Sequence, residues 1–179
     1  YGGGVLVQGG APIIRRNSIV GNRAYDPTGV VYGYGGGLAL LNTGALASGN
    51  LIENNDADYG GGIEIGGGTP RILGNEIRGN TAALSGGGVD ASLTPGRTAL
   101  IHGNRILSNS AAYGGGIEIF GFGSAIVTSN LISGNAATDP VVGYGGGVDV
   151  LYGDVRLVNN ELVVATPSTF SERTNDNTL

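Results

Sequence analysis

A glycine triplet followed by alternating apolar residues recurs through almost the whole chain, as in YGGGVLV at 1 and YGGGIEI at 59 and 113. The triplets begin at Gly2, Gly35, Gly60, Gly86, Gly114 and Gly145, so the repeat is 25 to 33 residues long. Self-similarity at such a period is typical of proteins in which each repeat forms one coil that stacks on the next. The repeat therefore predicts a solenoid over residues 1–164, followed by a polar tail or partial cap over residues 165–179.

Two asparagine motifs follow each triplet. The first is an apolar pair that ends at an asparagine, and its members are Asn17, Asn50, Asn75, Asn104, Asn130 and Asn160. The second, Asn-x-Ile-x-x-Asn, is completed at Asn22, Asn55, Asn80, Asn109 and Asn135, and it is lost at Ala165. Asparagine tolerates the left-handed conformation of a tight turn, and stacked amides can hydrogen-bond along an axis. We therefore expect the first set to form a structural ladder at a corner.

The order of apolar residues excludes amphipathic helices. Apolar residues occupy every second position over three or four residues, and a Gly or Asn then interrupts the pattern. Ile63 and Ile65, or Ile117 and Ile119, would point inward, while the residue between them would point outward. The predicted fold is all-β: a right-handed parallel β-helix of about six coils. Each coil has three short strands and contributes one asparagine to the ladder. The glycine triplet suggests a corner that needs positive φ or a close approach of neighbouring coils.

The order of strands, loops and asparagine corners resembles the pectate-lyase-like right-handed β-helix. The finer pattern is similar to the repeats of polymorphic outer-membrane and autotransporter passenger proteins, with Ile52-x-x-Asn55 and Ile77-x-x-Asn80 in the place of F-x-x-N. In this chain Ile replaces Phe, and GGG with an aliphatic residue replaces G-G-A-[ILV]. The resemblance implies the architecture, which serves adhesins and polysaccharide enzymes alike.

Composition narrows the possible partners. The chain has 179 residues, of which 40% are hydrophobic, 37 are glycine and six are proline, which excludes collagen and argues against disorder. Its net charge is −5, so we expect no nucleic-acid partner, and no apolar run is long enough for membrane insertion. There is no cysteine, which excludes a disulfide scaffold.

The ends of the chain suggest self-association. Residue 1 starts directly on a repeat, and a β-helix exposes unpaired backbone groups at each end unless a segment covers them. We expect that edge to pair either with further coils of a longer chain or with another copy of the chain, end to end.

One acidic residue occupies the outward position of four successive triplet strands: Glu64, Asp90, Glu118 and Asp149. We expect these carboxylates to form a solvated polar face, because charged residues are rarely buried. The resemblance to pectic enzymes implies a different role, in which Asp90, Glu118 and Asp149 are catalytic candidates and all four are candidate calcium ligands. No cofactor is required by either interpretation.

The loops after the triplet strands carry a second set of candidates. Phe120, Phe122 and Tyr152 lie on neighbouring coils near Arg97, and we consider them candidate ligand-binding residues for a polysaccharide or cell-surface glycan. These rings could equally cover one another or a partner protein. The tyrosines that precede the triplets, Tyr1, Tyr34, Tyr59, Tyr113 and Tyr144, are expected to stack at a corner, and His102 is expected to be an exposed surface residue.

The sequence favours an extracellular or cell-surface structural or adhesive module over an enzyme. The alternative is a polysaccharide lyase or glycoside hydrolase that acts on the first-sheet face, with calcium as its candidate cofactor. The chain contains no lysine, and no basic residue is placed to converge with the carboxylates, which counts against the enzyme. A self-assembling filament subunit is the third hypothesis.

Overall fold

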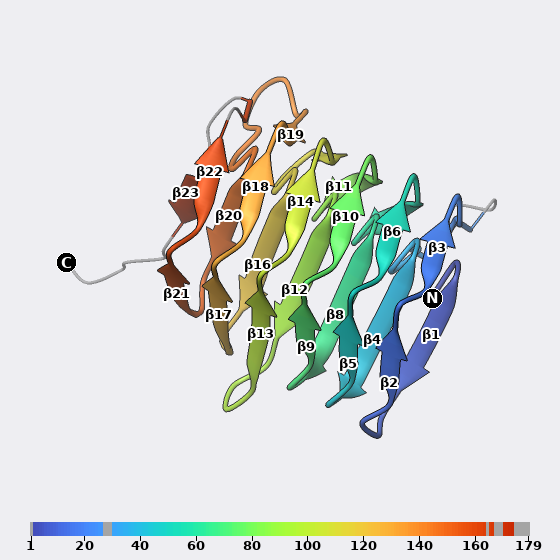
Figure 1. Ribbon diagram of the computed structural model, residues 1–179. Helices are drawn as coiled ribbons and strands as arrows, with labels where there is room; N and C mark the ends of the chain where they lie inside the picture. The colour runs from blue at the N-terminus through green and yellow to red at the C-terminus, as the bar shows by residue number, and fades with distance from the viewer. Residues whose placement is uncertain (1, 27–29, 164, 167–169, 174–179) are drawn as a thin grey trace.

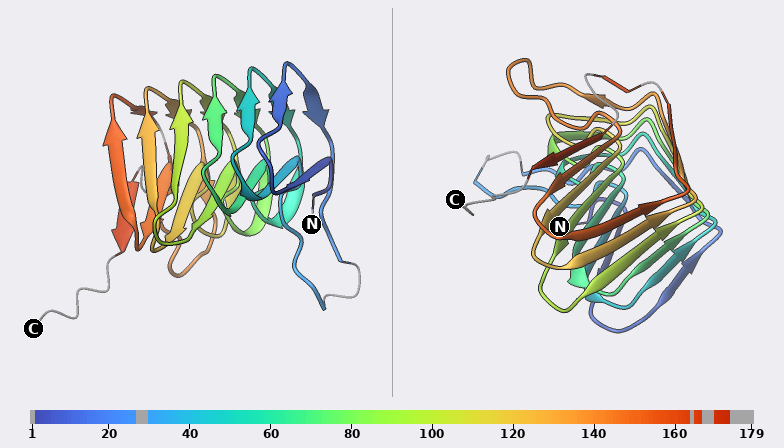
Figure 2. Two further views of the ribbon diagram at one scale, coloured as in Figure 1. Left: turned by 90° about the horizontal axis from the view of Figure 1, so that it is seen from below. Right: turned by 90° about the vertical axis from the view of Figure 1, so that its left-hand side faces the viewer.

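The computed structural model describes residues 2–26, 30–163, 165–166 and 170–173. Short strands from successive repeats pair in parallel and build four sheets that run along one axis (Figure 1). The coils lie almost on top of one another when they are viewed along that axis (Figure 2, right). The predicted parallel β-helix is confirmed.

The first sheet contains the strands that follow the glycine triplets. Its seven strands, in spatial order, are β1 (Val5–Gln8), β4 (Leu38–Thr43), β8 (Ile63–Gly68), β12 (Val89–Leu93), β16 (Ile117–Gly121), β20 (Val148–Leu151) and β23 (Phe170–Arg173). The last strand comes from the segment expected to be a tail, and it pairs in parallel with β20.

The second and third sheets have six strands each, on either side of the first asparagine motif. The second sheet consists of β2 (Ile13–Arg15), β5 (Leu46–Ser48), β9 (Arg71–Leu73), β13 (Thr98–His102), β17 (Ser124–Thr128) and β21 (Asp154–Val158). The third consists of β3 (Ser18–Val20), β6 (Leu51–Glu53), β10 (Glu76–Arg78), β14 (Arg105–Leu107), β18 (Leu131–Ser133) and β22 (Glu161–Val163).

A fourth, smaller sheet makes the expectation of three strands per coil wrong. Its strands are β7 (Asp56–Tyr59), β11 (Thr81–Ser85), β15 (Ser110–Ala111) and β19 (Ala136–Ala137). These segments follow the second asparagine motif and have little apolar alternation, because only one apolar residue of each, such as Ala57 or Ala82, is buried. The number of stacked strands thus varies from four to seven between sheets.

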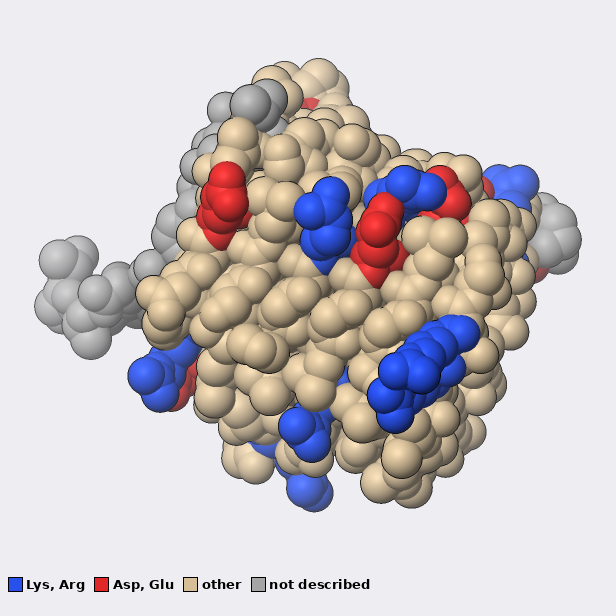
Figure 3. Space-filling model, in the orientation of Figure 1, with Lys and Arg blue, Asp and Glu red and all other residues tan. Residues whose placement is uncertain are grey.

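The core is a column of aliphatic side chains contributed in register by every coil. Ile63, Val89 and Ile117 pair across the first sheet and are fully buried. The isoleucine of the second asparagine motif forms a matching buried row on the third sheet at Ile52, Ile77, Ile106 and Ile132. The face formed by the second and third sheets is mostly uncharged, with a small number of charged side chains, some of them in contact (Figure 3). On the third sheet, Arg78 forms ion pairs with Glu53 at 3.0 Å and with Glu76 at 2.9 Å.

The asparagines form two ladders rather than one. In the expected ladder, Asn75 Oδ1 accepts hydrogen bonds from the backbone N–H and from Nδ2 of Asn50, both 2.9 Å long. Asn75 Nδ2 in turn donates to Ala47 O and to Asn104 Oδ1, each at 3.0 Å. The same bonding links Asn22 through Asn135 at the other end of the third sheet. Each inner amide therefore uses both of its donors and its acceptor inside the coil stack.

The expected left-handed conformation belongs to the residue before each ladder asparagine, and not to the asparagine itself. Positive φ occurs at Gly74 and Gly103, and at Arg16, Ser129 and Asn159 where glycine is missing. The bend thus lies one residue earlier, which aims the following asparagine side chain inward, where its amide can bond to the next rung.

The glycine triplets serve both of the purposes that the sequence suggests. The first glycine has positive φ, as at Gly60 and Gly86. The second and third glycines approach the next coil so closely that a Cβ on Gly36 would lie 2.5 Å from Gly61 O. Only glycine fits there.

Among the described residues, no helix is long and apolar enough to cross a membrane. The end-to-end association suggested by the sequence stays a prediction.

Candidate functional site

The acidic residues of the first sheet form a continuous column. Glu64 pairs with Asp90, Asp90 with Glu118, and Glu118 with Asp149 on adjacent parallel strands. They are buried, with exposed fractions of 3, 2, 4 and 0% in chain order. The expectation of a solvated polar face is therefore wrong.

The chain itself covers this column. The first glycine of each triplet turns back over the outward residue of the following strand, and a Cβ on Gly86 would lie 2.5 Å from Asp90 Cβ. The equivalent distance is 2.7 Å for Gly114 over Glu118 and 2.6 Å for Gly145 over Asp149. Strand alternation predicts which face a side chain takes, but it does not predict that a loop folds over that face.

Serine hydroxyls satisfy two of the buried carboxyl groups. Ser85 Oγ donates a hydrogen bond to Asp90 Oδ2, and Ser171 Oγ donates to Asp149 Oδ1 at 2.6 Å. By contrast, no described residue donates to the buried Glu64 Oε2.

Burial shifts the ionisation of two carboxyl groups in the column, those of Asp90 and Glu64. Desolvation raises the pKa of Asp90 to about 6, although the hydrogen bonds from Ser85 and Ser92 act in the other direction. Desolvation also raises the pKa of Glu64 well above its ordinary value, and the negative charge of Asp90 raises it further. Desolvation raises the pKa of the Tyr59 phenol, with a smaller contribution from Asp90. The raised pKa values mean that the carboxyl groups of Asp90 and Glu64 bind their protons more tightly than exposed carboxyl groups do.

Calcium binding by the column stays a prediction, and the geometry of the described side chains does not favour it. No group of three or more acidic or histidine side chains is close enough there to hold a metal ion. Calcium takes six to eight oxygen ligands around one point, whereas these side chains extend along a line, one from each rung. We derive no role through a metal ion.

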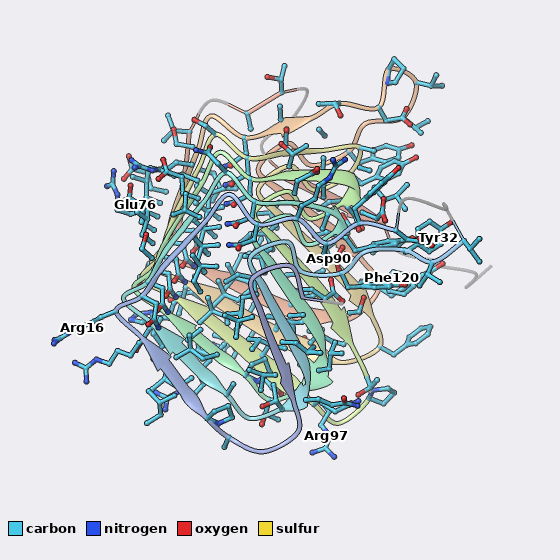
Figure 4. The ribbon with its side chains drawn as sticks, turned by 90° about the vertical axis from the view of Figure 1, so that its right-hand side faces the viewer. Arg16, Tyr32, Glu76, Asp90, Arg97 and Phe120 are labelled. Atoms are coloured by element: carbon cyan, nitrogen blue, oxygen red, sulfur yellow. The ribbon has the colours of Figure 1, made fainter. Side chains whose placement is uncertain are left out.

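A hollow of about 550 Å³ lies over the middle of the column. Its floor includes Asp90 and Glu118, and its walls are mainly aromatic and aliphatic. The residues that line it are Tyr34, Tyr59, Leu84, Ser85, Asp90, Ser92, Tyr113, Glu118, Phe120 and Leu151. Figure 4 shows Asp90 and Phe120 on the same side of the coil as Tyr32.

The tyrosines before the triplets stack as expected, except for Tyr1, which lies outside the described residues. The rings of Tyr34 and Tyr59 stack with centroids 5.1 Å apart, and those of Tyr113 and Tyr144 stack at 6.5 Å. Tyr32, from the long loop that precedes β4, packs edge-on against Tyr59 at 5.5 Å. Between the two stacked pairs, the tyrosine position is occupied by Ser85.

The loop aromatics are brought together, but Arg97 is not part of their cluster. Phe122 stacks on Tyr152 at 5.4 Å, and Phe120 contacts the same ring edge-on at 6.3 Å. Arg97 lines a separate hollow with Asn42 and Thr69, and it lies at another corner of the coil in Figure 4. The backbone of Arg97 does adjoin the aromatic loop, since Arg97 O accepts a hydrogen bond from Ser124 N–H at 2.8 Å. Its side chain, however, lies away from the acidic column. His102 is exposed, as expected.

Sequence reasoning missed Ser85, Ser92, Leu84 and Tyr32 as parts of this site. The signal for Ser85 was present, since the triplet at 86 is preceded by serine where other repeats have tyrosine. The contact of Tyr32 could not be predicted, because it depends on how a long loop folds back.

Comparison with known proteins adds one finding. A family model described as a right handed beta helix region matches residues 1–163. Neither the curated proteins nor the solved structures contain a match to this chain.

Proposed function

Because this chain belongs to the right-handed β-helix family, we propose that it is a rigid adhesive module whose first-sheet face binds a glycan. Such partners lie outside cells, so an extracellular or cell-surface location is part of the proposal. The observation that carries it is the hollow of about 550 Å³ with tyrosine and phenylalanine walls over a carboxyl floor.

The walls and the floor suit different parts of a sugar. Half-exposed aromatic rings present flat apolar faces, on which the apolar face of a sugar ring can stack. Carboxyl and serine oxygens accept hydrogen bonds, and sugars offer hydroxyl groups around their edges. Pockets that combine apolar walls with a few polar groups are typical of small-molecule sites.

The charge of the hollow favours neutral sugars or amino sugars over acidic ones. Of the described residues that line it, only Asp90 and Glu118 are ionisable below neutral pH, and none is an arginine or histidine. A uronic acid would place its carboxylate beside these groups without a compensating cation, which is unfavourable in a partly desolvated site.

The proposal is tested by titrating the chain with cellohexaose, mannohexaose, xylohexaose and chitohexaose, and with hexagalacturonate as the acidic comparator. We expect at least one of the four non-uronic hexasaccharides to bind and Phe120→Ala to weaken that binding about fivefold or more, because one aromatic stacking surface is lost.

Val141→Ala is the matched control, since Val141 is an exposed apolar residue on the loop at 138–143 and does not line the hollow. Binding of hexagalacturonate alone, or binding that Phe120→Ala leaves unchanged, would refute the proposal.

A glycoside hydrolase is the second candidate, because one observation favours it. Asp90 and Glu118 lie on adjacent rungs in the same hollow, and the pKa of Asp90 is raised to about 6, in the range of a general acid. Release of reducing ends from any of the four hexasaccharides, abolished by both Asp90→Asn and Glu118→Gln, would support hydrolysis. Binding without release would leave the adhesive function alone.

A further inference from the structure

The tyrosine column is interrupted at one rung, and the interruption lies at the centre of the hollow. Ser85 pairs with Tyr59 on one side and with Tyr113 on the other, so it occupies the rung between them. All three residues line the hollow. On either side, the tyrosine rings continue as stacked pairs with Tyr34 and Tyr144.

The missing ring leaves a slot of defined thickness. Parallel strands lie about 4.8 Å apart, so Tyr59 and Tyr113 come from rungs about 9.6 Å apart. Aromatic rings pack with centroid separations of about 4.5 to 7 Å. One ring placed midway between Tyr59 and Tyr113 would therefore contact both at ordinary stacking distance, while two rings would not fit.

The base of the slot is polar and already organised. Ser85 is buried, and its hydroxyl donates to Asp90 Oδ2. This bond fixes the Asp90 carboxyl group at the base, where its remaining lone pairs and those of Ser85 Oγ can accept hydrogen bonds. Leu84 and Ser92 also line the hollow of which the slot is a part.

We propose that the slot between Tyr59 and Tyr113 is a subsite for one sugar ring, held between the two tyrosine faces with its hydroxyl edge on Ser85 and Asp90. This rests on the proposed glycan-binding function and adds where one ring of the glycan is held. A sugar ring matches the slot because it has apolar faces and hydroxyl groups on its edge, whereas a purely aromatic ring would leave the polar base without donors.

The slot offers a direct test, because the missing side chain can be put back. Ser85→Tyr should fill the slot with a ring that stacks on Tyr59 and Tyr113, as the other rungs do. We expect it to weaken the tightest binder among cellohexaose, mannohexaose, xylohexaose and chitohexaose by roughly tenfold or more, because two stacking faces are lost at once. Ser85→Ala leaves the slot open but removes one polar contact, so it should weaken binding less than Ser85→Tyr does. Val141→Ala, which lies outside the hollow, is the control and should leave binding unchanged.

Tyr113→Leu provides a second variant in case tyrosine at position 85 prevents folding. It keeps the rung apolar but removes one stacking face, so it should weaken the same hexasaccharide about fivefold. Folding of each variant is checked by its thermal midpoint and far-UV circular dichroism.

Fluorescence gives an independent readout. The chain contains eight tyrosines and no tryptophan, so its ultraviolet-excited emission comes from tyrosine. Saturating hexasaccharide should change that emission in the wild type and in Val141→Ala, and the change should be lost or reduced in Ser85→Tyr, where a tyrosine side chain fills the slot.

The outcomes separate the two proposals. If Phe120→Ala weakens binding while folded Ser85→Tyr and Tyr113→Leu leave it unchanged, the subsite is wrong and the glycan-binding function stands. If none of the four hexasaccharides binds, both proposals fall. If 4-nitrophenol binds in the slot and the hexasaccharides do not compete with it, the slot takes an aromatic ring and the sugar subsite is overturned.

Discussion

Ser85 Oγ donates a hydrogen bond to Asp90 Oδ2 at the one rung where serine replaces tyrosine between Tyr59 and Tyr113. The substitution therefore has two consequences at the same place. It opens the aromatic wall, and it supplies a donor to a carboxyl group that is otherwise removed from water. A tyrosine at this position would close the hollow over the same carboxyl group.

The buried carboxyl groups predict that stability decreases as pH rises. The folded state raises the pKa of Asp90 from 3.8 to about 6, so the folded chain holds this proton more tightly than the unfolded chain does. The free energy of unfolding should thus be highest below pH 4 for this group and fall as pH rises through 6, by on the order of 3 kcal/mol. The raised pKa of Glu64 extends the decrease to higher pH.

Urea unfolding at several pH values between 5 and 8 measures the upper part of this decrease, about half of the total, on the order of 1 kcal/mol. The range stays above the titration of Asp139, whose lowered pKa gives a stability change of opposite sign at lower pH. Asp90→Asn should flatten the curve, because the amide does not titrate. An equally steep curve for Asp90→Asn would show that other groups cause it.

The asparagine ladder predicts graded losses of stability. Asn75→Ala and Asn104→Ala each remove a buried amide that both donates and accepts within the ladder, so each should lower the free energy of unfolding by about 1 to 3 kcal/mol. Asn17→Ala is the control, because Asn17 is exposed at the first rung and donates to Asn50 without accepting from a preceding asparagine. Thermal and urea unfolding compare the three variants, and equal losses would contradict a ladder effect.

Much of the architecture follows from the sequence because the repeat imposes it. The triplets and both asparagine motifs fix the register of adjacent coils, and the aliphatic residues at Ile63 and Ile65 are buried as their alternation predicts. The fourth sheet was missed because β15 and β19 have only two residues each, too few for a periodic pattern.

The candidate site was predicted less well, since its properties depend on covering loops. Alternation places Asp90 and Glu118 on the outer face of the first sheet, but the glycine turns and the tyrosines decide that this face is buried. The loop of Arg97 packs beside the loop of Phe122, as its place in the repeat suggests, but the direction of the arginine side chain, toward Asn42 and Thr69, does not follow from that place.

Calcium should have no effect on thermal stability. A ligand bound only by the folded state raises the melting temperature, but the described acidic side chains do not converge on one point. Melting curves with excess calcium and with a chelator should therefore coincide. A rise with calcium that Glu118→Gln removes would establish a metal site on the column and contradict this prediction.

The second glycine of the triplet predicts a large loss of stability from a single added methyl group. A Cβ on Gly87 would lie 2.5 Å from both Gly115 O and Ser110 O, which are backbone atoms of the neighbouring coil and cannot rotate away. Gly87→Ala should therefore lower the free energy of unfolding by about 3 kcal/mol or more, because adjacent coils must separate to admit the methyl group.

Gly103→Asn is the control: Gly103 has a φ of +65° and no atom within 4 Å of its Cβ position, and Asn159 adopts the same left-handed conformation at the equivalent corner. That variant should cost less than about 1 kcal/mol, since asparagine tolerates this conformation. Urea unfolding of both variants shows whether coil packing or backbone conformation requires glycine in the triplet. If Gly103→Asn lowers the free energy of unfolding as much as Gly87→Ala does, positive φ matters more than contact between coils.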